Sequence, residues 1–151
     1  MEKILALILK IFKARAERKI AQPTSIAVIS MRNLKNILKD KFPEGEIYLS
    51  DMYYLLCSRK DIVEFLATDR TNKMTYVTDE LDCDDFSYRL MGQFSVKGWS
   101  HLAFGIVWTD KHALNLFVDV DMKVWFIEPQ SDKVQEELEE WQGSKMRFVV
   151  L

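Results

Sequence analysis

The spacing of hydrophobic residues is helical in much of the first two thirds of the chain and strand-like in the last third. Four apolar residues with helical spacing follow Ser30: Met31, Leu34, Ile37 and Leu38. Ser30 can cap this helix, which is predicted to run to about Asp40 and to end at 42–45, Phe-Pro-Glu-Gly. A short strand at 47–49 is then expected to lead to a second capping serine, Ser50.

Two more helices are predicted before the strands begin. Ser58 and Asp61 have the spacing of a capping box, directly ahead of a helical apolar pattern. The other helix covers 83–94, and Asp82 is its expected N-cap. Between the two helices, residues 68–80 are polar and have no clear period, which favours a long ordered loop.

After Gly98 the pattern changes to that of β-strands. Four strands are expected, at 102–109, 112–120, 123–128 and 146–151. A helix at 132–142, ended by Gly143, is expected between the last two. Helices first and an antiparallel sheet second is an α+β arrangement. We therefore predict a single α+β domain over 22–151.

The first 21 residues are predicted to form an amphipathic helix and a hinge. The apolar stretch at 4–12 is interrupted by Lys10 and is too short to cross a bilayer. No small-residue cleavage motif of a signal peptide follows it, so a cytoplasmic location is expected. Lysines gather on one face of the helix, so residues 1–19 are expected either to pack on the domain or to contact an anionic membrane or a partner.

The composition of the chain excludes several classes of protein. A chain of 151 residues with 48% hydrophobic and 29% charged residues fills one core and is not disordered. Two cysteines cannot build a disulfide framework. Residues 1–20 hold six basic and two acidic residues of the chain's 21 and 23, so residues 21–151 hold 15 and 21, a net charge of −6. The negative charge of residues 21–151 argues against nucleic acid as a partner. The sequence leaves the oligomeric state open.

Two histidines and one cysteine are the candidates for nucleophilic chemistry. Cys83 is expected at the positive end of a helix dipole, where a thiolate is favoured, whereas Cys57 lies in an apolar run and is expected to be buried. His101 and His112 both lie near predicted strand starts. A lone residue of either type is more often structural than chemical.

The alternation of side chains along the strands favours His112 over His101 as the candidate base. If the hairpin loop is the three residues 120–122, Asp119 pairs with Lys123, and Glu128 lies diagonal to His112 on the same face. A carboxylate there can orient the imidazole. A two-residue loop would break this relation, which leaves Gln130 as the reserve orienting residue.

Three motifs together resemble a known family. They are Leu-Asp-Cys-Asp-Asp-Phe at 81–86, His-Ala-Leu-Asn at 112–115 and Ile-Glu-Pro-Gln at 127–130. In this order they resemble the papain-like cysteine protease domain of the fairy-ring mushroom agglutinin and its short microbial and phage relatives, over about 34–133. The resemblance implies a papain-like fold with the nucleophile at a helix N-terminus.

The same resemblance implies a thiol hydrolase that acts on a peptide or protein substrate. Cys83 would be the nucleophile, His112 the base and Glu128 the residue that orients the base. Gln130 and Asn115 are the reserve candidates for the orienting role. The agglutinin's sugar-binding trefoil has no counterpart in these 151 residues, so its lectin activity is not expected to transfer.

An acidic cluster surrounds the candidate nucleophile. Its carboxylates oppose a thiolate at Cys83. They either only cap the helix, or they bind a hard divalent cation whose charge would relieve the repulsion. The resembled protease depends on calcium, so Ca²⁺ or Mn²⁺ is expected at Asp79, Asp82, Asp84 and Asp85. No organic cofactor is expected, and the cysteines and histidines lack the paired spacing of a zinc site.

Two other functions remain open from the sequence. The Asp-Cys-x-x-Phe motif at 82–86 is also similar to that of cell-wall peptide amidases. A papain-like domain without catalysis, serving as a binding or assembly module, is the third. It is favoured by the acidic surroundings of Cys83 and by the absence of a glutamine at 76–80 to stabilise an oxyanion.

Overall fold

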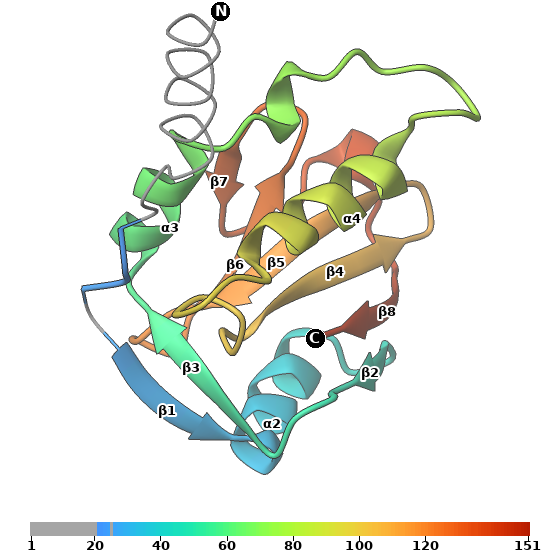
Figure 1. The fold of residues 1–151 in the computed structure, drawn as a ribbon. Coiled ribbons are helices and arrows are strands. Elements are labelled where there is room, and N and C mark those ends of the chain that lie inside the picture. Colours follow the sequence, from blue (N-terminus) through green and yellow to red (C-terminus); the bar gives the residue numbers. More distant parts are fainter. Residues whose placement is uncertain (1–20, 25) are drawn as a thin grey trace, which may run out of the picture.

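The computed structural model describes residues 21–24 and 26–151 (Figure 1). The amphipathic helix predicted within residues 1–19 lies outside the described residues. The described part contains three α-helices and eight strands. Within it, no helix combines the length and the apolar character needed to span a bilayer.

Six strands form the main sheet, in the order β2-β8-β4-β5-β6-β7. All neighbours in it are antiparallel except β2 and β8, which are parallel. The strands are β2 (Glu46–Tyr48), β4 (Phe104–Thr109), β5 (Ala113–Val118), β6 (Val124–Glu128), β7 (Lys133–Gln135) and β8 (Met146–Val150). The parallel pair joins two segments that are about a hundred residues apart in the sequence.

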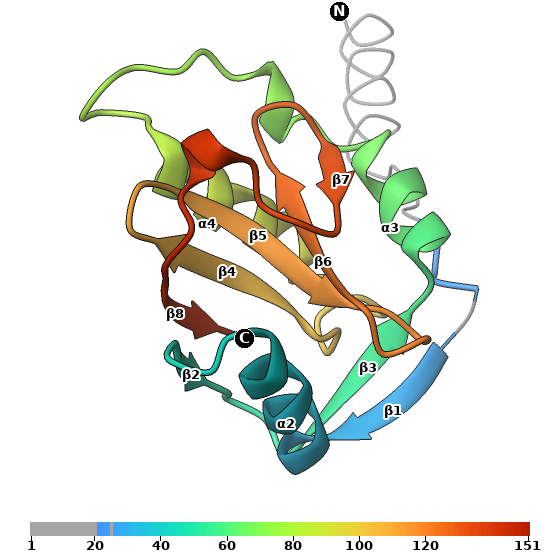
Figure 2. The same cartoon turned by 180° about the vertical axis from the view of Figure 1, so that it is seen from behind.

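The helices pack on opposite faces of this sheet. Helix α4 (Cys83–Phe94) lies across β4 and β5 on the face seen in Figure 1, and in Figure 2 these strands lie in front of it. Helices α3 (Arg59–Leu66) and α4 share one apolar core with the sheet. Helix α2 (Met31–Lys41) packs into the other core, against strand residues that include Leu114 and Leu116.

A separate two-stranded ribbon completes the fold. Strand β1 (Ile26–Ser30) pairs antiparallel with β3 (Tyr53–Cys57). Single bridges from Leu55 to Leu102 and from Cys57 to Asp119 attach the ribbon to the rest of the domain.

The predicted arrangement of N-terminal helices followed by an antiparallel sheet is wrong. Strands β1, β2 and β3 alternate with the helices in the first half, and β2 makes the main sheet mixed. Two local predictions fail with it. The residues after Ser50 enter β3 and do not form a helix, and the helix expected at 132–142 is instead β7 and a short 3-10 helix, η2 (Glu140–Gln142).

Predictions that depended on local signals are confirmed. Ser30 caps α2 by accepting from the Asn33 amide at 3.3 Å. The loop between α3 and α4 is ordered and contains one short 3-10 helix, η1 (Thr71–Lys73). The β5–β6 turn has the three-residue form, because the Asp119 amide donates to the Lys123 carbonyl at 3.0 Å.

The capping box of α3 also anchors the start of the described chain. Oδ2 of Asp61 accepts from the amide and the hydroxyl of Ser58, at 3.2 and 2.6 Å. Its Oδ1 accepts from the amide and the hydroxyl of Thr24, at 3.0 and 2.8 Å. Burial by itself would raise the pKa of Asp61, but these four hydrogen bonds lower it to about 2.

We predict that Asp61→Asn destabilises the fold by about 1–2 kcal/mol at pH 7, because the charged carboxylate makes stronger hydrogen bonds than an amide. The native pKa lies below the unfolded one, so this stability is present above pH of about 4 and is lost as the pH falls towards 2. Urea denaturation of both proteins across this pH range measures it. Glu64→Gln, in an exposed pair on the same helix, is the control; equal stabilities of the Asp61 variant and the wild type at pH 7 would contradict the assignment.

Candidate functional site

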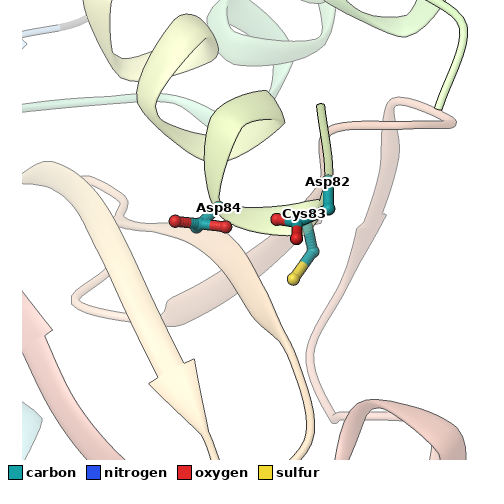
Figure 3. Close-up of side chains that lie close together, drawn as sticks. All are labelled: Asp82, Cys83 and Asp84. Atoms are coloured by element: carbon teal, nitrogen blue, oxygen red, sulfur yellow. The ribbon is translucent and has the colours of Figure 1, made fainter. Parts of the chain in front are cut away.

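Cys83 is the first residue of α4 and follows the N-cap residue Asp82 (Figure 3). The thiol is partly buried, and the backbone amides of Ala113 and Asp84 lie close enough to act on its pKa in the lowering direction. The N-terminal half of the helix is fixed to the sheet because Nδ2 of Asn115 donates to the Ser87 carbonyl, at 3.0 Å. Asn115 therefore anchors α4 and lies on the sheet face opposite to Glu128.

His112 and Glu128 form a buried pair at the margin of the sheet. Nε2 of His112 lies 2.8 Å from Oε2 of Glu128, and both side chains are more than nine-tenths buried. The observed register of β5 and β6 explains this, since Asn115 opposes Ile127 as the three-residue turn requires. The imidazole therefore has the carboxylate neighbour that strand parity predicted.

Glu128 is held by other partners as well. Nε2 of Gln142 donates to Oε2 of Glu128 at 3.0 Å, and the backbone amide of Gln130 donates to Oε1 at 3.4 Å. The indole of Trp141 lies 4.9 Å from the imidazole of His112, measured between ring centroids. These contacts fix the rotamer of Glu128 and cover one side of His112.

Gly143 allows this covering segment to approach the β4–β5 turn. Its φ is +95°, and a Cβ atom at this position would lie 2.4 Å from the Asp110 carboxylate. The Thr109 hydroxyl donates to the Gln142 carbonyl at 2.5 Å and accepts from the His112 amide at 3.0 Å. Residues 141–143 are therefore tied to the backbone that carries His112.

The structure brings His112 and Glu128 into contact. It places Cys83 near the backbone of Ala113, the residue that directly follows His112. Trp141 and Gln142 belong to the same site and were missed, because 132–142 was expected to be a helix with a solvated face. His101 lies elsewhere, beside Tyr53 and Tyr54.

The electrostatic surroundings disfavour a thiolate. Burial raises the pKa of the Cys83 thiol, and the charges of Asp82 and Asp84 raise it further, against the lowering effect of the two backbone amides. Burial raises the pKa of Cys57 to about 12, with help from two carboxylates. Cys83 is therefore the more reactive thiol, but it is protonated near neutral pH.

The expected four-carboxylate metal site is assembled only in part. Asp82, Cys83 and Asp84 have ligand atoms within 4.8 Å of one another. Oδ1 of Asp82 is buried and has no hydrogen-bond partner among the described residues, and contact with the Asp82 carboxyl raises the pKa of Asp84. Asp82 and Asp84 thus fit a hard cation, whereas Asp85 accepts from the Asp82 amide and Asp79 lies outside the group.

Comparison with known proteins finds similarity of fold. No protein-family model and no curated protein matches the chain. A solved complex of PSL1a with E64 has a TM-score of 0.71, with 23% identity over 82% of this chain and 50% of that one. Polyporus squamosus lectin bound to the human-type influenza-binding epitope Neu5Acα2-6Galβ1-4GlcNAc has a TM-score of 0.68, with 22% identity over 82% and 49%. The chain thus spans about half the length of these proteins.

These findings correct the family resemblance. The two structures named above are a PSL1a complex and a Polyporus squamosus lectin complex, neither is described as a papain-like cysteine protease, and no family model matches the chain. The papain-like fold class and the hydrolase and cysteine protease activities that the resemblance implied are therefore withdrawn. At this level of identity the likeness concerns the fold alone.

We predict that iodoacetamide labels Cys83 but not Cys57 in the folded protein, and that the rate rises with pH above neutrality. Asp84→Asn is expected to speed labelling at pH 7 about fourfold, since a unit charge about 5 Å away in water contributes roughly 0.8 kcal/mol. Peptide mapping by mass spectrometry gives the site and the rate. Asp121→Asn, in the β5–β6 turn, is the control for net charge, and an Asp84 variant no faster than this control would refute the electrostatic explanation.

Proposed function

We propose that the chain is a ligand-binding module whose ligand binds at the N-terminal end of α4, through the Cys83 thiol. The observation that carries this proposal is that Cys83 lies near the backbone amide of Ala113, the residue next to His112, whose imidazole contacts Glu128. Such a group offers a soft nucleophile, a backbone donor and an oriented imidazole to one ligand.

The state of the thiol favours binding over rapid turnover. A catalytic cysteine is usually activated by a lowered pKa, whereas burial and two carboxylates raise the pKa of Cys83. A protonated thiol reacts slowly but still captures an electrophile held beside it. His112 would accept the thiol proton during such a capture, and Glu128 would stabilise the resulting imidazolium.

The ligands named for the two similar structures supply the probes. One was solved with E64 and the other with a sialylated trisaccharide. E64 carries an epoxide, so a thiol can add to an epoxide carbon; the C–S bond forms, the C–O bond breaks, and the thiol proton ends on the ring-opened oxygen. This reaction needs no further oxidant or reductant.

We predict that E64 forms one covalent adduct, on Cys83, and that Cys83→Ala abolishes it. Glu128→Gln is expected to slow the reaction at least tenfold, because loss of the carboxylate leaves the imidazole poorly oriented and its cation unsupported. Intact-protein mass spectrometry over time measures the adduct. Cys57→Ser is the matched control and should react like the wild type. Absence of an adduct, or its persistence in the Cys83 variant, would overturn the proposal.

A second binding function is favoured by a hollow at the ribbon. This hollow of about 450 Å³ is lined by Asp51, Met52, Tyr53, Tyr54, Leu55 and His101. The Tyr53 side chain is 65% exposed, so its ring is accessible. Aromatic rings pack against the apolar face of a sugar, and carboxylates and imidazoles hydrogen-bond to its hydroxyls, which makes a saccharide the second candidate ligand.

We predict that Neu5Acα2-6Galβ1-4GlcNAc binds at this hollow and that Tyr53→Ala weakens the affinity at least tenfold, as expected for an aromatic anchor. Titration calorimetry on the whole chain measures the affinity. Tyr88→Ala, an exposed tyrosine on α4, is the control. Unaltered affinity in the Tyr53 variant, or no heat at millimolar sugar, would exclude the hollow as a site for this sugar.

A further inference from the structure

A second group of oxygen atoms lies where η1 meets the turn after β6. Nδ2 of Asn72 donates to Oδ2 of Asp132 at 2.5 Å, which joins the two segments. Asp69 lies close enough for its charge to act on Asp132, and its Oδ2 accepts from the Thr71 amide at 2.7 Å. Two carboxylates, one amide and one hydroxyl therefore gather in one region.

Three oxygens of this group are buried without a hydrogen-bond partner in the described part of the chain. They are Oγ1 of Thr71, Oδ1 of Asn72 and Oδ1 of Asp132. Thr71 is completely buried. A buried oxygen without a partner is costly, and native proteins seldom keep several of them together unless a water or an ion satisfies them. The group therefore offers several free oxygen atoms as ligands to a cation.

The electrostatics also indicate a missing positive charge. Burial, with help from the neighbouring charge of Asp69, raises the pKa of Asp132 to about 6, and Lys73 and the hydrogen bond from Asn72 only partly offset these effects. Within residues 21–24 and 26–151, neither Asp69 nor Asp132 forms an ion pair. Two carboxylates thus lie together, partly buried, without a cationic partner.

We propose that Asp69, Thr71, Asn72 and Asp132 form a binding site for a hard divalent cation, Ca²⁺ by preference. All the donors are oxygens, which excludes the soft metals that prefer sulfur and nitrogen. Ca²⁺ accepts six to eight oxygen ligands in flexible geometries, so these side chains together with waters satisfy it. This site shares no residue with the Asp82–Asp84 pair, and it does not rest on the proposed function.

The position of the site gives it a structural consequence. The turn that contains Asp132 begins directly after Glu128, and the Gln130 amide in that turn contacts the Glu128 carboxylate. A cation bound between η1 and this turn links the loop before α4 to the strand end that supports His112. Cation binding therefore rigidifies the backbone on both sides of the thiol site.

The test is Ca²⁺ binding by the full chain, measured by titration calorimetry and by thermal unfolding. A hundredfold excess of Ca²⁺ over its Kd should raise the Tm by roughly 5 °C. Asp132→Asn and Asp69→Asn should abolish the part of this rise that remains when Asp82 and Asp84 are neutralised, and Thr71→Val should weaken the affinity of that site by about tenfold or more. Without Ca²⁺, Asp132→Asn should be at least as stable as the wild type, because it removes the repulsion from Asp69.

The matched control is Asp82→Asn/Asp84→Asn, which removes the other carboxylate pair and should leave the Asp132-dependent shift unchanged. If the Asp132 variant fails to fold, the Thr71 and Asp69 variants decide the question. The proposal is overturned if these variants bind Ca²⁺ as tightly as the wild type, if only the control loses binding, or if the wild type binds none at about 10 mM Ca²⁺, above the range of weak extracellular modules.

Discussion

The register of the β5–β6 hairpin is the constraint on which the rest of the structure depends. Asp119 sets it: one carboxylate oxygen accepts from the amides of Asp121 and Lys123, both at 2.9 Å, and the other from the Trp125 indole at 2.7 Å. A slip of one residue would turn every side chain of β5 to the other face. The core under α2 and the contact of His112 with Glu128 would then be lost together.

The same constraint explains which parts of the fold the sequence could predict. The helix caps depend on residues within a few positions of one another, so Ser30 and Ser58 were correctly interpreted, whereas the sequence left two turn lengths open and the structure has the three-residue one. The parallel pairing of β2 with β8 has no local signal, because its strands are only a few residues long and far apart in the chain. The helix expected at 132–142 does not form, because Lys133–Gln135 pair with β6, which is a contact with another strand that the segment's own sequence does not signal.

The residues of the candidate site also fall into those that local sequence signals indicated and those that they did not. Three short motifs singled out Cys83, His112 and Glu128, and the helix start at Cys83 and the contact of His112 with Glu128 follow from local signals. Trp141 and Gln142 were not found, because they reach Glu128 only through a covering segment that depends on the conformation of Gly143. The three short motifs behind the family resemblance contain Cys83, His112 and Glu128. They do not cover the ribbon or the mixed sheet, and they predicted a family that the comparisons do not give.

Two pairs of carboxylates account for part of the negative charge of residues 21–151 and lie near the candidate site. Asp82 and Asp84 flank the thiol and raise its pKa, so neutralising them would act on the reactivity of Cys83 directly. Asp69 and Asp132 lie on the other side of the connecting loop, next to the turn that follows Glu128. Neutralising that pair would act on the turn whose Gln130 amide contacts Glu128. The charge beside the thiol and the surroundings of this turn therefore depend on different residues.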